Sequence, residues 1–357
     1  MSDSRIDRNG MVRRGRRSTK KKKSSGMTSV FLGFLLVALI AAGSAAWLVL
    51  LPYGPQAATF VELAPGSSSA HIGRQLEEAG VVRTRFAFDL LRLWKRGTLQ
   101  AGEYRFDHPA PALEVYERIA RGDVVIRSLT IPEGENIFEI AARVEEAGLG
   151  TRQEFLNAAV NEAGLVSDLD PGAKSLEGYL FPDTYNFSRT TSPAQIAAAM
   201  VWRFRQVAGE LGLKKNVHQV VTLASLVERE TAVGAERPEV ASVFENRLAK
   251  NMPLMSDPSV IYGLELEGRW RGQIHESDLT YNTPYNTYLH AGLPPGPVAN
   301  PGIKSLRAAM YPAKTDYLYF VAAGADAQGL SRFARTLDEH NRNVAEYRHA
   351  LKKAGER

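Results

Sequence analysis

The stretch VELAPGSSSAHIGRQLEEAG (Val61–Gly80) and a second version of it, LTIPEGENIFEIAARVEEAG (Leu129–Gly148), set the architecture of this chain. Each begins with a short extended run, passes through a Pro/Gly turn and continues with apolar residues three and four positions apart. That spacing predicts a helix with one apolar face. The closing Gly80 and Gly148 suit helix C-caps, which favour positive φ. The pattern predicts two small strand–helix modules, together spanning residues 58–150.

Outward from these modules, strands and helices do not alternate regularly. Residues 101–106 predict a strand and residues 113–120 a helix. From Pro193 the chain becomes strongly helical, before a strand at residues 317–322 and a last helix from about Leu337. A doubly wound sheet needs regular alternation. We therefore expect an α+β fold, with a mixed α+β domain over residues 151–357.

The segment before the repeats predicts a membrane anchor. Residues 27–54 contain no charged side chain, and residues 30–51 are almost wholly apolar. A helix of about 20 apolar residues crosses a hydrocarbon core of about 30 Å. The alternative is a cleaved signal peptide with small residues at 42–46, but signal h-regions have only about 7–15 residues. We therefore predict a transmembrane helix at residues 27–52.

The charge distribution predicts the orientation of this anchor. Residues 1–26 carry a net charge of +8 within a chain total of +5, so the remainder is about −3. Such a basic cluster stays in the cytoplasm. Residues 1–26 are thus expected to be a cytoplasmic tail at the inner membrane, with the later domains periplasmic. Contact of the tail with nucleic acid or anionic lipid is the alternative. Because the exported part has no basic stripe, we expect no nucleic-acid partner.

Several classes of chemistry find no support in the residues. The chain has no cysteine, which excludes disulfides, thiolate metal sites and a Cys nucleophile. Its seven His show no metal-ligand spacing, and no G-x-S-x-G elbow or phosphate-binding glycine loop occurs. We expect neither a metal nor a cofactor.

The segment VHQVVTLASLVERET (217–231) holds the strongest catalytic candidate. At about 100° per residue, Glu228 falls on an apolar helix face, whereas Glu230 points away from it. A carboxyl group on such a face has a raised pKa, which a general acid near neutral pH requires. The alternative for Glu228 is a buried ion pair with Arg237 or Arg247. Glu230 is expected to be a surface charge or the partner of an arginine.

Short blocks across the second half of the chain resemble one known family. They are EGYLFPDTY (177–185), ASLVERET (224–231), ERPEVASVFENRL (236–248), MPLMSDPSVIYG (252–263), YNTY (285–288), GLPPGPVANPG (292–302), SLRAAMYP (305–312), YLYFVA (317–322) and TLDEHN (336–341). Their order and content resemble the YceG-like endolytic murein transglycosylases. The resemblance implies that the essential glutamate is the first of the E-x-E-T motif, Glu228. It also implies a short anchor and LysM-like modules over residues 58–150.

This sequence departs from the family pattern at two places. Met255 stands where the family usually has Gln, and Gly329-Leu330-Ser331 replaces a frequent Gly-Gly-His. The first departure bears on a substrate contact, and the second removes any role for that His.

The resemblance implies a peptidoglycan lytic transglycosylase that cleaves the MurNAc–GlcNAc bond within nascent strands and leaves 1,6-anhydroMurNAc ends. The muramic 6-hydroxyl is then the nucleophile, so one Glu can act as both acid and base, whereas an ordinary glycosidase needs two carboxylates. Candidate substrate contacts are Glu177, Asp257, Tyr262, Tyr285, Asn286 and Thr287. Capping a turn, packing in the core or satisfying loop backbone are their ordinary alternatives.

Two other functions stay open at this point. One is a muramidase that uses water as nucleophile and Glu177 or Asp257 as base. The other is a non-catalytic wall-binding anchor that recruits glycan synthases. Glycan strands and the membrane are the expected partners, with peptidoglycan synthases as further candidates.

Overall fold

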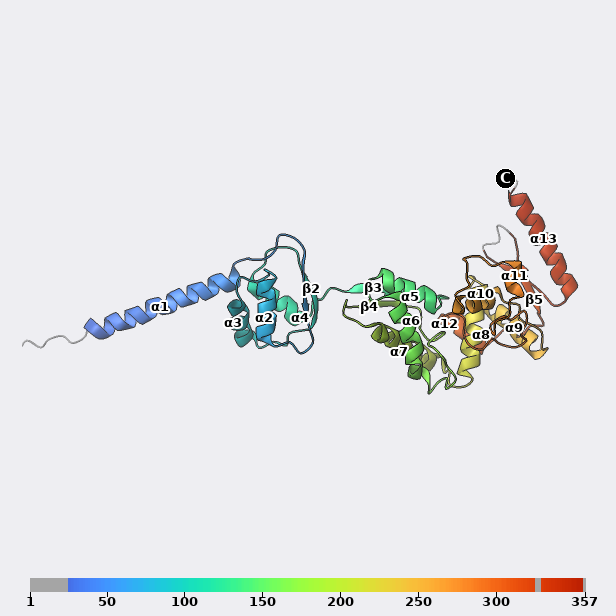
Figure 1. Cartoon of the computed structure of the whole chain (residues 1–357), viewed down its shortest axis with the longest axis horizontal. Coiled ribbons are helices and arrows are strands. Elements are labelled where there is room, and N and C mark those ends of the chain that lie inside the picture. The colour runs from blue at the N-terminus through green and yellow to red at the C-terminus, as the bar shows by residue number, and fades with distance from the viewer. Residues whose placement is uncertain (1–24, 325–328, 356–357) are drawn as a thin grey trace, which may run out of the picture. The chain divides into compact units, whose positions relative to one another are not determined.

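The computed structural model describes residues 25–324 and 329–355, and its contacts divide the chain between Asp123 and Val124 (Figure 1). Each part mixes helices with short antiparallel strand pairs, which confirms the expected α+β class. Residues 1–24 of the expected basic tail lie outside the described residues.

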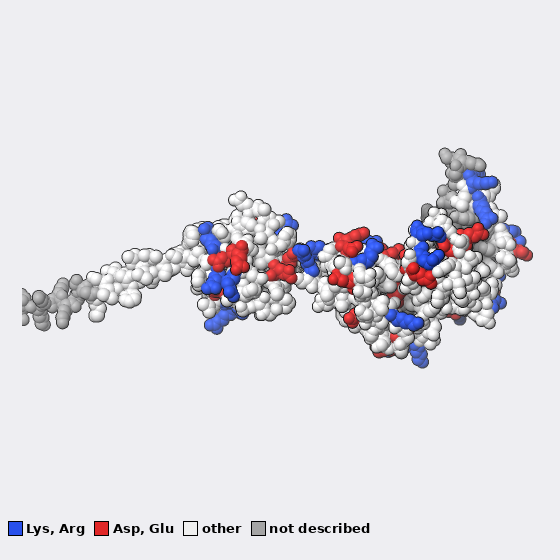
Figure 2. Space-filling model, in the orientation of Figure 1, with Lys and Arg blue, Asp and Glu red and all other residues white. Residues whose placement is uncertain are grey.

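The first unit begins with α1 (Ser25–Leu50), an exposed apolar helix. Its candidate membrane span, Ser29–Leu50, has 22 residues and a mean hydropathy of 2.3. Figure 2 shows no charged side chain along it. At about 1.5 Å per residue the span is about 33 Å long, which fits a single-pass anchor.

The rest of the first unit is a small strand–helix domain. β1 (Thr59–Leu63) pairs antiparallel with β2 (Gly102–Phe106). The helices are α2 (Ser69–Glu78), α3 (Arg85–Lys95) and α4 (Ala112–Arg121). Ser68 caps α2, and its hydroxyl accepts a hydrogen bond from the His71 N–H. The first repeat thus forms the strand and helix that its sequence predicts.

The second repeat also forms a strand and a helix, β3 (Arg127–Thr130) and α5 (Ile137–Glu146). β3 pairs antiparallel with β4 (Thr184–Phe187), and α5 packs on α6 (Arg152–Asn161). Its apolar face joins the large core of the second unit. The expected module boundary at residue 150 therefore falls inside a compact unit, because the apolar face of this repeat is buried by later segments. LysM-like character stays a prediction for either repeat.

The remaining elements of the second unit are mostly helical. They are η1 (Glu162–Val166), α7 (Pro193–Leu211), α8 (Val217–Glu230), α9 (Arg237–Ala249), α10 (Asp257–Leu266), α11 (Glu276–Leu279), α12 (Ile303–Met310), β5 (Tyr319–Ala322), β6 (Ser331–Ala334) and α13 (Leu337–Gly355). β5 and β6 pair antiparallel. The strand and last helix expected near the C-terminus are confirmed.

α8 is the central element of this unit. Residues 221–228 are all buried, and α9, α10 and α12 contact the helix. At Gly178, which has φ +87°, a Cβ atom would lie 2.5 Å from Pro297 Cγ and 2.7 Å from Val221 Cγ1. Glycine is therefore needed where the Pro-rich segment packs against α8.

Candidate active site

The carboxyl group of Glu228 is buried, and each of its oxygens has a protein partner. Its side chain is 3% exposed, and Oε1 lies 2.5 Å from Arg237 Nη2. The Gly302 N–H donates to Oε2 at 2.8 Å. Burial raises the pKa of Glu228, while the Gly302 N–H and Arg237 favour its charged form and Glu133 opposes it. The structure thus shows the Arg237 ion pair that was the alternative role for this residue.

Glu230 lies in a different environment from the one the helical phase predicts. Its carboxyl is not a surface charge, since burial raises its pKa to about 7. Ser256 Oγ donates to its Oε1 at 2.7 Å, while Asp257 raises and Arg247 lowers the same pKa. As the last residue of α8, Glu230 also lies at the negative end of the helix dipole, which disfavours a carboxylate. A carboxyl poised near neutral pH is suited to both giving and taking a proton.

Two pockets meet at Glu230. One has a volume of about 440 Å³ and is lined by Glu133, Gly134, Glu135, Glu228, Arg229, Glu230, Thr231, Ala232 and Arg237. The other has a volume of about 290 Å³ and is lined by Glu230, Phe244, Arg247, Leu254, Met255, Asp257, Tyr288, Phe320 and His340. Glu230 is the only residue in both sets of lining residues.

The turn before α10 presents the hydrogen-bond donor to Glu230. Thr287, a candidate contact, is buried, and its Oγ1 accepts from the Ser256 N–H at 2.9 Å. Its carbonyl accepts from the Met255 N–H at 3.2 Å. Asp257 accepts from the Tyr288 hydroxyl at 2.6 Å and faces the second pocket. Thr287 therefore stabilises the turn through two hydrogen bonds, whereas Asp257 lines the second pocket.

Met255 lies in the second pocket and is 50% exposed. Its φ of +52° lies in the left-handed region, which costs roughly 1–2 kcal/mol for a residue with a Cβ. Hydrogen bonding of this turn to Thr287 holds that conformation. Met255, which stands where the family usually has Gln, therefore changes a side chain in the wall of this pocket.

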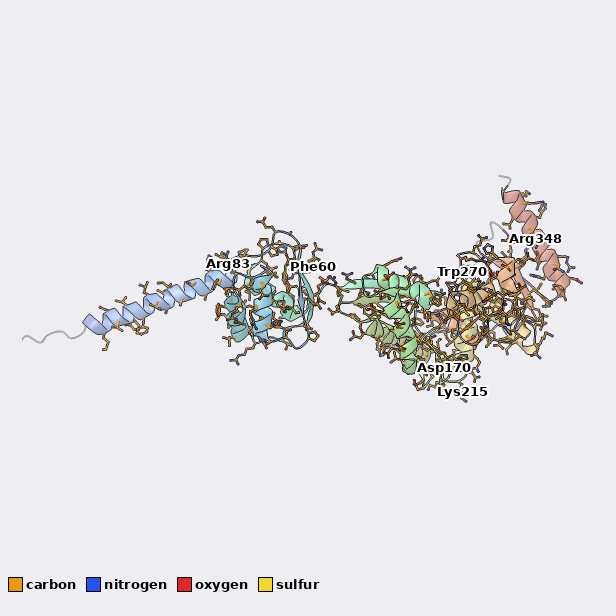
Figure 3. All side chains as sticks on the ribbon, in the orientation of Figure 1. Phe60, Arg83, Asp170, Lys215, Trp270 and Arg348 are labelled. Carbon is orange, nitrogen blue, oxygen red and sulfur yellow. The ribbon has the colours of Figure 1, made fainter. Side chains whose placement is uncertain are left out.

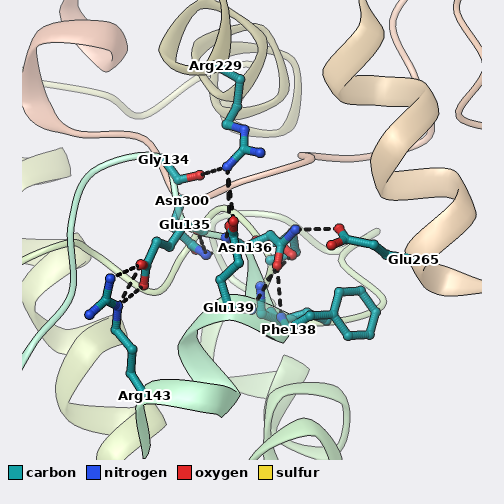
Figure 4. A network of polar contacts seen from close by, with 11 residues as sticks. Gly134, Glu135, Asn136, Phe138, Glu139, Arg143, Arg229, Glu265 and Asn300 are labelled. Carbon is teal, nitrogen blue, oxygen red and sulfur yellow. Dashed lines mark hydrogen bonds and ion pairs between the residues drawn. The ribbon is translucent and has the colours of Figure 1, made fainter. Parts of the chain in front are cut away.

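The turn of the second repeat lines the first pocket, and Figure 4 shows its polar contacts. Arg229 Nη1 donates to the Gly134 carbonyl at 2.9 Å and lies 3.2 Å from Glu139 Oε2. The side chain of Asn136 caps α5 and donates to Glu265 Oε2 at 2.6 Å. These contacts join the second repeat to α8 and α10, so the repeat builds the site.

Glu177, Tyr262 and Tyr285 gather at a separate pocket of about 350 Å³. His218, at the start of α8, lines the same pocket. Because His218 precedes Glu230 by twelve residues, about 18 Å of helix separates the two positions. These three candidate contacts therefore do not lie beside the Glu230 carboxyl.

Glu177 is buried with its polar partners. Its Oε2 accepts from the Ile137 N–H at 2.9 Å, and its Oε1 accepts from Asn300 Nδ2 at 2.8 Å. Burial raises its pKa to about 8 despite these donors and that of Tyr262. The Tyr262 ring packs edge-on against Tyr285, with centroids 5.0 Å apart. Glu177 thus ties the start of α5 to the loop of Asn300.

Asn286 forms hydrogen bonds with the backbone of its own loop, which was the ordinary alternative for this residue. It is fully buried, and its Nδ2 donates to the carbonyls of Leu279 and Tyr281 at 3.0 and 2.8 Å. Its Oδ1 accepts from the Tyr288 N–H at 2.9 Å. The side chain therefore shapes the loop and leaves no free polar atom for a ligand.

The YceG-like family model matches residues 61–346. The chain belongs to the YceG-like family. Among curated relatives, the endolytic murein transglycosylase of Bacillus subtilis strain 168 is 34% identical over 308 residues, covering 80% of this chain and 84% of that protein. The endolytic murein transglycosylase of Streptococcus pneumoniae strain D39 is 32% identical over 320 residues, covering 80% of this chain and 58% of that protein.

A solved structure supports the same YceG-like assignment. The crystal structure of a putative YceG-like protein from Listeria monocytogenes matches with a TM-score of 0.52 and 33% identity. The match covers 81% of this chain and 99% of that one.

Sequence analysis did not predict that Glu230 lies beside Ser256, Arg247 and Tyr288. Helical phase shows which way Glu230 points but not which later loop packs over it. The one available signal was its place as the last residue before the helix ends at Thr231. Among the residues that the structure describes, no group of three His, Asp or Glu is placed to hold a metal ion.

We predict that Glu177 makes the stability of the protein pH-dependent. Its folded-state pKa, about 8, lies above the ordinary glutamate value of 4.5, so folding favours the neutral acid. This contribution is fully present below about pH 4.5 and is lost as the pH rises through 8. Glu177→Gln should flatten the unfolding free energy between these values, as measured by denaturant titration. The control Glu245→Gln, at an exposed position, should keep the wild-type slope; an equal slope in Glu177→Gln would contradict the prediction.

Proposed function

We propose that this protein is a membrane-anchored endolytic peptidoglycan transglycosylase with Glu230 as its general acid and base. The observation that carries the proposal is the carboxyl of Glu230, with a pKa of about 7, at the junction of two pockets. The names of the curated relatives support the substrate and the reaction class. The proposed bond is that between MurNAc and GlcNAc within a strand.

The reaction needs one carboxyl group that changes protonation state. Protonated Glu230 gives its proton to the glycosidic oxygen as the bond to the muramic C1 breaks. The resulting carboxylate then takes the proton of the muramic 6-hydroxyl as that oxygen bonds to C1. This step closes the 1,6-anhydro ring and restores the acid. Ser256 Oγ–H, which donates to Oε1, holds the carboxyl in place through both steps.

Glu228 has a positioning role in this proposal. It joins Arg237 of α9 and the Gly302 N–H to α8, two residues before Glu230. Burial raises the pKa of Glu228, but Arg237 and the Gly302 N–H favour its charged form and so oppose proton donation. Glu228 as the acid itself, which the resemblance implies, is the alternative. Of the other candidates, we propose Asp257 as a substrate contact, since it lines a pocket with Glu230.

The products of the purified protein decide the reaction class. Incubation with long uncrosslinked glycan strands should yield internal cuts whose new ends are 1,6-anhydromuramic acid. Mass spectrometry distinguishes these ends, which are one water lighter than reducing ends. Reducing ends would show that the protein is a muramidase. Strands that stay intact would show that it does not cut glycan and would favour the non-catalytic anchor.

A pair of isosteric variants decides between the two glutamates. Glu230→Gln removes the transferable proton, so the cleavage rate should fall by about 10²-fold or more. Thermal stability should be kept, because Glu230 has no ion pair among the described residues. Glu228→Gln leaves buried Arg237 with only its longer contact to Glu133 at 3.4 Å, so it should lower stability more than Glu230→Gln does.

Activity of the folded fraction is the measurement that separates these roles. Folded Glu228→Gln should retain most of its activity, and wild-type kcat/KM should fall above about pH 7 as Glu230 loses its proton. If the Glu230→Gln variant is active and the folded Glu228→Gln variant is inactive, Glu228 and not Glu230 is the general acid.

The proposed orientation places the catalytic unit in the periplasm. α1 is long and apolar enough to span the membrane, and the basic residues before it favour a cytoplasmic N-terminus. A reporter that is active only outside the cytoplasm, fused after Arg357, should be active and stay with the inner membrane in high salt. An inactive reporter would reverse the orientation, and a released, shortened form would indicate a cleaved signal peptide.

A further inference from the structure

Helix α3 (Arg85–Lys95) is apolar on two faces. One face is buried in the first unit through Ala87, Phe88 and Leu91. A neighbouring side exposes large apolar side chains at helical spacing, with exposed fractions of 64% for Phe86, 44% for Leu90, 74% for Leu93 and 71% for Trp94. Four such side chains on one helix of a small domain form an exposed apolar patch of the kind that binds another apolar surface.

The patch is continuous with the proposed membrane span. α3 contacts α1, and an apolar groove of about 730 Å³ lies between them. Leu90, Leu91 and Trp94 line it from α3. Its other wall is formed by five residues near the end of α1, namely Ala42, Ala45, Ala46, Val49 and Leu50.

This contact places α3 at a definite depth. The five α1 residues belong to the span Ser29–Leu50 and occupy its last part, about 12 Å of helix. The chain between α1 and the domain is short, because Tyr53 exchanges both backbone hydrogen bonds with Ala110 at 3.1 Å. If the span lies in hydrocarbon, Leu90 and Trp94 lie at the level of its outer leaflet.

The side chains around this junction are those that suit a membrane interface. The Arg83 guanidinium lies 4.3 Å from the Trp47 ring centroid and 4.9 Å from that of Tyr53. Arg83 is labelled in Figure 3, where α1 meets the domain. On α3, Lys95 lies 5.3 Å from the Trp94 centroid. Aromatic rings with neighbouring cations are typical of the headgroup level.

We propose that α3 lies in the outer interface of the bilayer, with Phe86, Leu90, Leu93 and Trp94 in the lipid. This proposal rests on α1 spanning the membrane. The lipid surface is the occupant because Leu90 and Trp94 of the patch line one apolar groove together with the end of the span. The first unit is then attached at two places, through α1 and α3, and cannot rotate freely about the end of its anchor. One face of the domain is held to the membrane, which leaves its other faces to the wall.

Tryptophan quenching in vesicles tests this placement. The full chain has four Trp, so three variants would each keep one of Trp47, Trp94 and Trp202, with Phe replacing the others. Each is reconstituted in phosphatidylethanolamine–phosphatidylglycerol vesicles with or without acyl-brominated lipid. Trp94 should lose emission in brominated vesicles, as Trp47 does. Trp202, which is 61% exposed on α7 of the second unit, should keep its emission and serves as the matched control.

The outcomes separate this proposal from the membrane span. Quenched Trp47 with unquenched Trp94 overturns the α3 proposal and leaves the span intact. Unquenched Trp47 overturns the span itself. Trp94 that is unquenched by lipid yet shielded from aqueous acrylamide indicates a protein occupant and also overturns the proposal. Leu90→Ser with Leu93→Ser, at two exposed positions, should reduce the quenching of Trp94 without unfolding the domain.

Discussion

The buried contact of the Glu228 carboxylate with Arg237 and the Gly302 N–H joins two consecutive helices to a loop 74 residues further along the chain. α8 supplies the carboxylate, α9 the guanidinium and the end of the Pro-rich loop the backbone donor. Breaking a buried ion pair by removing one partner leaves an uncompensated charge, which costs far more than a surface pair contributes. This contact therefore holds the end of α8 in place, and both pockets at Glu230 depend on where that end lies.

Burial raises the pKa of both glutamates, which are separated by one residue, but different groups surround the two carboxyls. Glu228 has a cation and a backbone donor that favour the charged form. Glu230 has a hydroxyl donor and a neighbouring Asp257, and its pKa rises to about 7. Enzymes commonly assign different acid–base roles to nearby acids through differences in their surroundings. The difference here follows from the elements packed on each side of α8.

The second strand–helix repeat shows how similar sequences take different places. Its turn, with Gly134 bonded to Arg229, forms a wall of the candidate site. The first repeat pairs its strand with β2 and stays within the unit that carries α1. Local pattern is alike in both because the strand, turn and helix are local structures. The two repeats pack against different elements because the apolar faces available to each lie elsewhere in the chain and differ.

The sequence by itself determined the elements whose causes are local. These include the long uncharged span, both strand–helix repeats, the amphipathic helix at residues 217–230 and the last helix from Leu337. Through the family resemblance, the sequence also identified the E-x-E-T motif that contains both glutamates. Only the tertiary structure decided that Glu228 pairs with Arg237 while Ser256 covers Glu230. The reason is that a carboxyl group's pKa depends on the donors, charges and burial that distant segments bring to it, and helical phase carries no information about those segments.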